Sequence, residues 1–526
     1  MSVLSVLVGT LGALMGWVLL KLIALVINAA YFWHWSLQHH SIPNELGWIS
    51  ILIPVVGGLI VGFMSRYGSS QIRGHGIPEA MEAVLEKKSR IPPRVAWLKP
   101  LASAISIGTG GPFGAEGPII MTGAAIGSVI GQLIPMNAGE RKTLLAAGAA
   151  AGMTVIFGTP AAAVLMAVEL LLFEWKPRSL VPASIAAAVA QCWRPFLIGE
   201  GAMFPMPQTA QLPPSGFLWC VVVGILAGLL AMLLTWLVYF FERQFKKLPV
   251  HWMWWPACGG LLVGIGGWLD PRALGVGYHN IRAILNARLS TVSAIKLFVA
   301  KGFIWSLALG SGTAGGVLAP LVMVGGAAGQ LLGNWIPVGS PALWALLVMG
   351  GVMGSAMRAP LMAAFFGFEA TGNAHALPAL LLVCMVAHLV AVLFMDRSIM
   401  TEKLARRGHD IRQELMQDPF EIRRAGDFVM RAWRNPVNSP RSPDSPGPEP
   451  DSAVPEVTVD ERDLLSHVIE MMHLKGVQKV RVVTEREKNP IGMIDRDDLI
   501  THYARSRMDD RRKSRPCRFR QNDPPQ

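Results

Sequence analysis

A glycine-rich block occurs twice in this chain of 526 residues, and the second copy lies 202 positions after the first. Chance matches are common among glycines, but eight pairs in one register indicate an internal duplication. Many transporters have this layout, with their site between two repeats. Flanking blocks keep the same order, Gly74–Gly76 with Gly275–Gly277, and Pro160 and Glu169 with Pro360 and Glu369. The eight pairs are Lys99 and Lys301, Gly108 and Gly310, Gly110 and Gly312, Gly114 and Gly316, Pro118 and Pro320, Gly123 and Gly325, Gly127 and Gly329, and Gly131 and Gly333.

One carboxylate distinguishes the two copies. The first copy contains Glu116, where the second has Leu318. Glycines surround Glu116, and small residues then recur at every fourth position, a spacing typical of close helix packing in lipid. Backbone N–H groups in a glycine-rich turn and in the first turn of a helix bind anions. The sequence therefore predicts an anion site at membrane depth with an acid beside it.

The composition indicates a membrane protein. Hydrophobic residues make up 52% of the chain and charged residues 16%, against roughly 25% charged in soluble domains. Apolar runs between residues 5 and 395 predict more than a dozen helices, several too short to cross a hydrocarbon layer of about 30 Å. Short or broken helices are typical of binding sites at the membrane midplane. We expect an all-α polytopic membrane protein made of two helical repeats, about 1–200 and 210–405. The first apolar run lacks a basic leader and merges into a full span, so we expect no cleavable signal peptide.

Basic residues predict the orientation of the loops. Six Lys and Arg residues lie in 66–94, but only three lie in the corresponding segment 267–295, and 196–215 has none. The positive-inside rule places 66–94 in the cytoplasm and 196–215 outside. The difference in the number of basic residues between 66–94 and its counterpart 267–295 predicts that the second half is inserted upside down. The two repeats would then be inverted.

Several classes of function lack their minimal sequence parts. Five scattered cysteines form no metal or disulfide framework. The chain has no His-Glu-x-x-His, no Gly-x-Ser-x-Gly and no Gly-Lys-Ser/Thr phosphate loop, so we expect neither an enzyme nor an ATP-driven pump. Acids are scarce in the spans, which disfavours a cation or organic-solute transporter. We expect no metal cofactor and no nucleic-acid partner.

The chain changes character after its last apolar run. Residues from Arg397 onward are rich in charge, and the Ser/Pro-rich piece 435–455 is typical of a disordered linker. The pattern behind it predicts one small α/β unit. The basic end, 508–526, fits either a solvated tail or an anionic membrane surface. The predicted elements of the unit are Val457–Val459, the amphipathic segment 464–472, and strands over 477–483 and 491–494.

Three motifs in order resemble those of the CLC family of chloride channels and proton/chloride exchangers. Gly74–Pro78 is similar to the family's Gly-Ser-Gly-Ile-Pro, Gly114–Pro118 to Gly-Arg-Glu-Gly-Pro, and Gly315–Pro320 to Gly-Gly-Ile-Phe-Ala-Pro. The resemblance covers residues 1–405. The segment 425–507 is similar to a single CBS domain interrupted by the insert 435–455, whereas members with such tails usually carry a pair. Binding of adenine nucleotide by this tail stays open.

The resemblance implies a homodimer in a bacterial inner membrane, with both termini cytoplasmic and one anion pathway in each subunit. Helix N-termini from both halves would converge on dehydrated chloride, with Glu116 as the gate. An ionised Glu116 competes with the anion for the same amides, because both carry one negative charge. The alternative is a carboxylate that only caps its own helix. The residues that the motifs place at the anion are His75, Gly76, Ile77, Gly114, Gly117, Val317, Leu318 and Met400.

Four positions depart from the family pattern. His75 replaces serine, Ala115 replaces arginine, Leu318 replaces phenylalanine and Met400 replaces the inner tyrosine. An imidazole can donate one N–H or become cationic, so His75 can change anion selectivity and add pH dependence. Alternatively, its ring turns aside to a backbone carbonyl. The loss of the tyrosine removes a donor and a constriction.

A proton relay is the feature that separates exchangers from channels in this family. The internal relay glutamate would fall at Leu170, which cannot carry a proton. Glu169 and Glu174 are candidates for a displaced relay, although Glu169 and Glu369 also fit structural carboxylates at matched helix ends. The sequence favours a gated passive or weakly coupled chloride channel, with a proton-coupled antiporter as the alternative. Fluoride export is disfavoured because the branch of the family that exports fluoride departs from the motif Gly-x-Glu-Gly-Pro, which is intact here.

Overall fold

The computed structural model describes residues 1–38, 40, 42, 47–85, 87–395, 397–405, 425, 428, 457–463, 465–484 and 490–501. The chain divides into two units, Met1–Gln413 and Glu414–Gln526. The predicted insert 435–455 and basic tail 508–526 lie outside the described residues.

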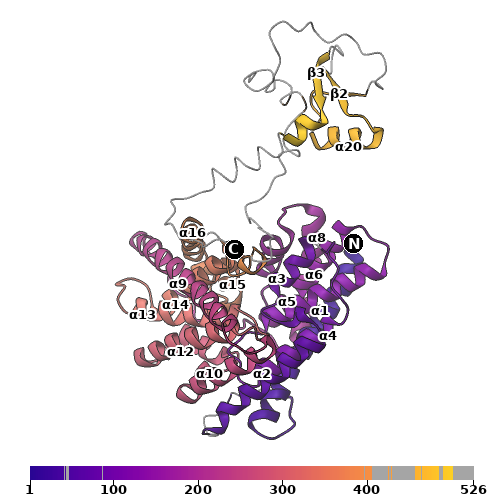
Figure 1. The fold of residues 1–526 in the computed structure, drawn as a ribbon. Helices are drawn as coiled ribbons and strands as arrows, with labels where there is room; N and C mark the ends of the chain where they lie inside the picture. The colour runs from indigo at the N-terminus through magenta and orange to yellow at the C-terminus, as the bar shows by residue number, and fades with distance from the viewer. Residues whose placement is uncertain are drawn as a thin grey trace. The chain divides into compact units, whose positions relative to one another are not determined.

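The first unit is a bundle of helices, and its two halves occupy opposite sides of the bundle in Figure 1. Within the described residues, six helices are long and apolar enough to cross a membrane, and four shorter apolar ones accompany them, as the sequence predicted. The first half consists of α1 (Ser2–Tyr31), α2 (Ile49–Tyr67), η1 (Ser70–Ile72), α3 (Ile77–Leu85), α4 (Val95–Gly108), α5 (Glu116–Leu133), α6 (Ala138–Phe157), α7 (Pro160–Met166), η2 (Ala167–Leu172) and α8 (Pro177–Leu197). The second consists of α9 (Pro214–Lys246), η3 (Trp252–Trp254), α10 (Trp255–Leu269), η4 (Pro271–Ala273), α11 (Tyr278–Leu285), α12 (Thr291–Gly310), α13 (Leu318–Gly333), α14 (Pro341–Met357), α15 (Pro360–Thr371), η5 (Ala374–Ala376), α16 (Leu377–Phe394) and α17 (Glu402–Ala405).

Helices α2 and α10 show how the two halves are related. A Cβ on Gly58 would overlap the carbonyl of Pro256, and a Cβ on Gly260 would overlap that of Pro54. Reciprocal contacts of this kind indicate a local two-fold axis. The two helices run antiparallel, so the halves are inverted with respect to one another. These pairs keep the 202-residue offset, and the sequence reading did not include them in the repeat.

The predicted stripes of small residues pack helices closely in both halves. In α5, a Cβ on Gly123 would overlap the carbonyl of Gly148 in α6. In α13, a Cβ on Gly329 would overlap the carbonyl of Trp344 in α14. Without side chains at these positions the backbones approach closely, which is how helices associate in lipid.

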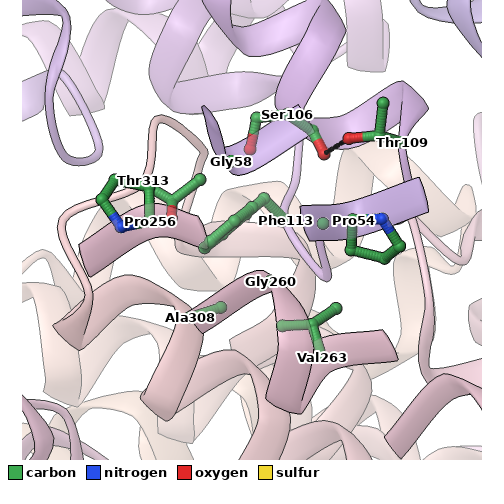
Figure 2. A pocket seen from close by; sticks show the side chains of 11 residues that line it. Pro54, Gly58, Ser106, Thr109, Phe113, Pro256, Gly260, Val263, Ala308 and Thr313 are labelled. Atoms are coloured by element: carbon green, nitrogen blue, oxygen red, sulfur yellow. Dashed lines mark hydrogen bonds between the residues drawn. The ribbon is translucent and has the colours of Figure 1, made fainter. Parts of the chain in front are cut away.

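A cavity of about 10 Å³ lies where the halves meet (Figure 2). This volume holds roughly one water molecule, so the halves are tightly packed here. Phe113 projects between them in the same view. Most of the lining residues are repeat mates, namely Pro54 with Pro256, Gly58 with Gly260, Ser106 with Ala308, and Gly111 with Thr313.

The second unit contains a small mixed sheet, as predicted. The strands lie in the order β1-β2-β3, with β1 parallel and β3 antiparallel to β2. Alternate residues of β2, Val480 and Val482, are buried against Leu465 and Val468 of the helix. The described elements are β1 (Thr458–Asp460), α20 (Leu465–Lys475), β2 (Lys479–Val483) and β3 (Pro490–Asp495).

Candidate functional site

The three glycine motifs meet at one place in the first unit. Gly114 and Gly316 form an antiparallel bridge, with N···O distances of 3.3 and 2.9 Å, and Gly74 pairs with Ala314 in a parallel bridge. A Cβ on Gly117 would overlap the carbonyl oxygen of His75. The segments therefore come together only because these positions have no side chains.

Glu116 is the first residue of α5 and is completely buried. Its Oε1 accepts a hydrogen bond from the backbone N–H of Ala319 in the first turn of α13, in the other half. Its Oε2 has no hydrogen-bond partner among the described residues. A Cβ on Gly114 would overlap this carboxylate, and one on Gly316 would lie 2.7 Å from Oε2. The carboxylate thus occupies a space lined by glycine and by a helix N-terminus, which also suits a small anion.

Two fully buried lysines brace the turns around the site. Lys99 Nζ donates to the carbonyl oxygens of Ile72 and Gly74 at 2.9 and 2.8 Å. Lys301 makes the matching pair of bonds in its own half, at 3.0 and 2.7 Å. The sequence paired these lysines in the repeat but suggested no role for them.

The His75 turn joins the site to the end of the helical unit. His75 is 5% exposed, and its ring nitrogen Nδ1 is buried without a hydrogen-bond partner among the described residues. The N–H of Gly76 donates to Glu79 Oε2 at 3.0 Å, and Glu79 Oε1 forms an ion pair with Lys403. Nδ1 of His75 is therefore not bonded to a described carbonyl, and the ion pair fixes the turn to α17. Sequence reasoning missed Glu79 and Lys403.

Met400 lies just before α17 and is completely buried. Its N–H donates to Ser398 Oγ at 3.3 Å, and the hydroxyl of Tyr239 donates to the carbonyl of Ile399 at 2.7 Å. The thioether of Met400 can accept a weak hydrogen bond but cannot donate one. The segment is thus fixed through its backbone, while the side chain offers an anion no donor.

The predicted proton-path residues have other partners. Leu170 is completely buried in the π-helical turn η2. The two oxygens of Glu169 accept hydrogen bonds from the N–H groups of Leu361 and Met362 at 3.3 and 2.9 Å. These amides belong to the first turn of α15. Glu169 therefore caps a helix of the other half.

Glu174 lies between η2 and α8, outside the predicted spans. It accepts a hydrogen bond from Ser179 at 2.8 Å, and Lys176 and Lys142 lie 3.5 and 4.0 Å away. Burial raises the pKa of this carboxyl, but the Ser179 hydrogen bond and the two lysines outweigh burial and lower it overall. Glu174 is therefore ionised at neutral pH and is a poor carrier of a proton.

The remaining predicted anion ligands lie at helix starts. Val317 precedes α13, Leu318 is its first residue, and Ile77 is the first residue of α3. All three are buried beside the glycine motifs. The amide that holds Glu116 comes one residue later, from Ala319.

Comparison with known proteins identifies the family. The pattern of the voltage gated chloride channel family matches residues 57–392. The chain belongs to this family. A protein from Escherichia coli named voltage-gated ClC-type chloride channel ClcB is 30% identical over 70% of this chain and 90% of its own length. A putative chloride channel protein, ClcB-like, from Ralstonia nicotianae is 28% identical over 69% of this chain and 87% of its own.

Solved structures show the same fold. A slow cyanobacterial Cl⁻/H⁺ antiporter superposes with a TM-score of 0.69 and 22% identity, over 77% of this chain and 97% of its own. A CLC-type fluoride/proton antiporter gives a TM-score of 0.63 and 24% identity, over 74% of this chain and 94% of its own. At these identities the likeness concerns the fold.

Proposed function

We propose that this protein is a gated chloride channel, passive or weakly coupled to protons, and that Glu116 is its gate. The observation that carries the proposal is the hydrogen bond from the Ala319 N–H to the Glu116 carboxylate. That amide lies at a helix start, beside glycine backbone. A chloride ion needs the same surroundings, so carboxylate and anion compete for one place.

The pathway is proposed to continue from Glu116 to the His75 turn. A Cβ on Gly117 would overlap the His75 carbonyl, so the two segments are in direct contact. The ring nitrogen Nδ1 of His75 is buried and has no described partner. Buried polar atoms are normally hydrogen-bonded, which makes this nitrogen a candidate ligand for the transported anion.

Weak proton coupling is supported by the partners of the acidic residues. Position 170 is leucine, both oxygens of Glu169 are occupied by backbone amides, and Glu174 is held ionised by its neighbours. Leucine carries no proton, Glu169 is engaged at the start of α15 and Glu174 stays ionised, and these partners favour weak coupling over a relay through the three positions. The relatives from E. coli and R. nicotianae are named as chloride channels.

The alternative is a chloride/proton antiporter with a displaced relay. The solved structures of the same fold include a Cl⁻/H⁺ antiporter and a fluoride/proton antiporter. We further propose that the protein works as a homodimer in a bacterial inner membrane, with cytoplasmic termini and a complete pathway in each subunit, and that it catalyses no reaction. The tail is proposed to be a single CBS-like domain able to bind adenine nucleotide.

Purified protein in liposomes tests the proposed function directly. An outward chloride gradient should drive chloride efflux with little uphill proton movement. Chloride efflux with a fixed proton ratio would establish the antiporter instead. Sodium flux without chloride flux would reject anion transport altogether.

A further inference from the structure

A second cavity, of about 430 Å³, lies where α10 ends and α12 begins, beside the turn that leads into Gly275. Its lining includes the charged side chains of Asp270, Arg272 and Lys296, the ring of His279 and the apolar side chain of Leu269. Nothing in the proposed transport mechanism uses this cavity.

The charges of the described residues that line the cavity do not balance. Arg272 binds Asp270 through two nitrogens, Nε at 2.9 Å and Nη2 at 3.1 Å, and this bidentate pair forms a neutral, fixed wall. Asn280 holds the same turn by donating to the Arg272 carbonyl at 2.8 Å. Lys296 has no hydrogen bond or ion pair with any residue that the structure describes. Among the described residues, its ammonium is therefore a positive charge on the cavity without a carboxylate partner.

The same cavity borders on apolar surface. Leu269 is 74% exposed, and Trp268 before it is also exposed. Lys296 lies on α12 between Val292 and Val299, and the spacings of four and three residues place all three on one face of the helix. Both valines are more than half exposed, and α12 is apolar enough to span a membrane. An exposed tryptophan and a lysine with an apolar stem are typical of the boundary between lipid and water.

We propose that this cavity binds the phosphate of an anionic phospholipid. Lys296 contacts the phosphate, the fixed guanidinium of Arg272 lines the site beside it, and an acyl chain lies along Leu269 and Val292. The apolar border favours a lipid over a free phosphate, because a free anion would leave Leu269 and the valines uncovered. The bound lipid would brace the η4 turn, whose Ala273 carbonyl accepts a hydrogen bond from Lys301.

Native mass spectrometry of the full chain in detergent tests the site, with phosphatidylglycerol and phosphatidylcholine as probes. Lys296→Gln should weaken phosphatidylglycerol binding about tenfold, the cost of losing one hydrogen bond to a charged group. Lys296→Arg should retain it. Lys246→Gln is the matched control, since Lys246 ends another spanning helix and is paired with Glu242 at 2.8 Å. This control should bind like the wild type.

Other outcomes would overturn the proposal. Equal retention of phosphatidylglycerol by the wild type and Lys296→Gln would remove Lys296 from the site. Equal retention of phosphatidylcholine by the wild type would indicate contact without headgroup recognition. Displacement of phosphatidylglycerol by millimolar inorganic phosphate would indicate a free-anion site. Leu269→Ser further distinguishes a phospholipid site from a free-phosphate site, because it should weaken binding of the lipid but not of inorganic phosphate.

Discussion

Glu169 and Glu369 each accept hydrogen bonds from the first turn of a helix in the opposite half. Glu169 binds the first turn of α15, and Glu369 binds the N–H groups of Ala161 and Ala162 in the first turn of α7, at 3.0 and 2.9 Å. A carboxylate at a helix N-terminus satisfies free amides and opposes the positive end of the helix dipole. The reciprocal pair therefore joins the two halves.

Glu169→Gln and Glu369→Gln should accordingly have matching effects. Each replaces a charged acceptor by a neutral one, and each should lower the free energy of unfolding by about 1.5 kcal/mol. Thermal unfolding of the purified protein in detergent measures this. Neither variant should alter the proton movement that accompanies chloride flux. A change in proton movement in Glu169→Gln but not in Glu369→Gln would identify Glu169 as a relay.

The glycine motifs and their convergence could be predicted from the sequence, because backbone ligands at a close approach need glycine at fixed places. The repeat through α2 and α10 was missed, since Pro54 and Gly58 lie in apolar sequence where single matches carry little weight. The ion pair between Glu79 and Lys403 joins residues 324 positions apart, and no local pattern indicates it. Similarly, the sequence does not indicate that the N–H of Ala319 donates to Glu116, because this contact depends on how the two halves pack.

The proposed homodimer gives a prediction for mixed dimers. Both repeats and all three motifs lie in one chain, so each subunit should contain a complete pathway. Gly316→Val places a side chain against the Glu116 carboxylate and should close the subunit that carries it. A linked dimer of one wild-type and one Gly316→Val subunit should keep about half of the chloride flux. Complete loss of flux in a folded mixed dimer would indicate a shared pathway.

His75→Ser tests the second part of the proposed pathway. A serine hydroxyl donates a hydrogen bond but cannot become cationic, so the preference between chloride and nitrate should change by severalfold. Any pH dependence that the imidazole contributes should disappear. Flux measurements in liposomes with each anion, at several pH values, show both effects. An unchanged selectivity and pH profile would mean that the ring only fills space.

The Leu170→Glu variant tests whether the absence of a carboxyl at position 170 is the only feature that limits proton coupling. The wild type should show little uphill proton pumping when a chloride gradient is imposed. The new carboxyl would lie in a buried turn, one residue from Glu169, and should create measurable pumping if the rest of a proton path is intact. A pH-sensitive dye inside the liposomes reports the pumping. Stoichiometric pumping by the wild type would contradict the channel proposal.

Glu116→Gln tests the gate itself. The amide oxygen can still accept the N–H of Ala319, but it carries no charge and yields the helix end to chloride more readily. Chloride efflux from liposomes should be preserved or raised, and its dependence on external pH should vanish because no carboxylate remains to be protonated.

The control for this variant is a carboxylate that only caps a helix. Glu140 forms a capping box with Asn137 at the start of α6, with bonds of 3.0 and 2.8 Å. Glutamine can still complete the capping box, so Glu140→Gln should lower stability by only about 0.5 kcal/mol, through the lost charge at the helix N-terminus, and leave the pH profile of the flux unchanged. If Glu116→Gln behaved in the same way, Glu116 would be a cap rather than a gate, because only a carboxylate that competes with the anion links protonation to flux.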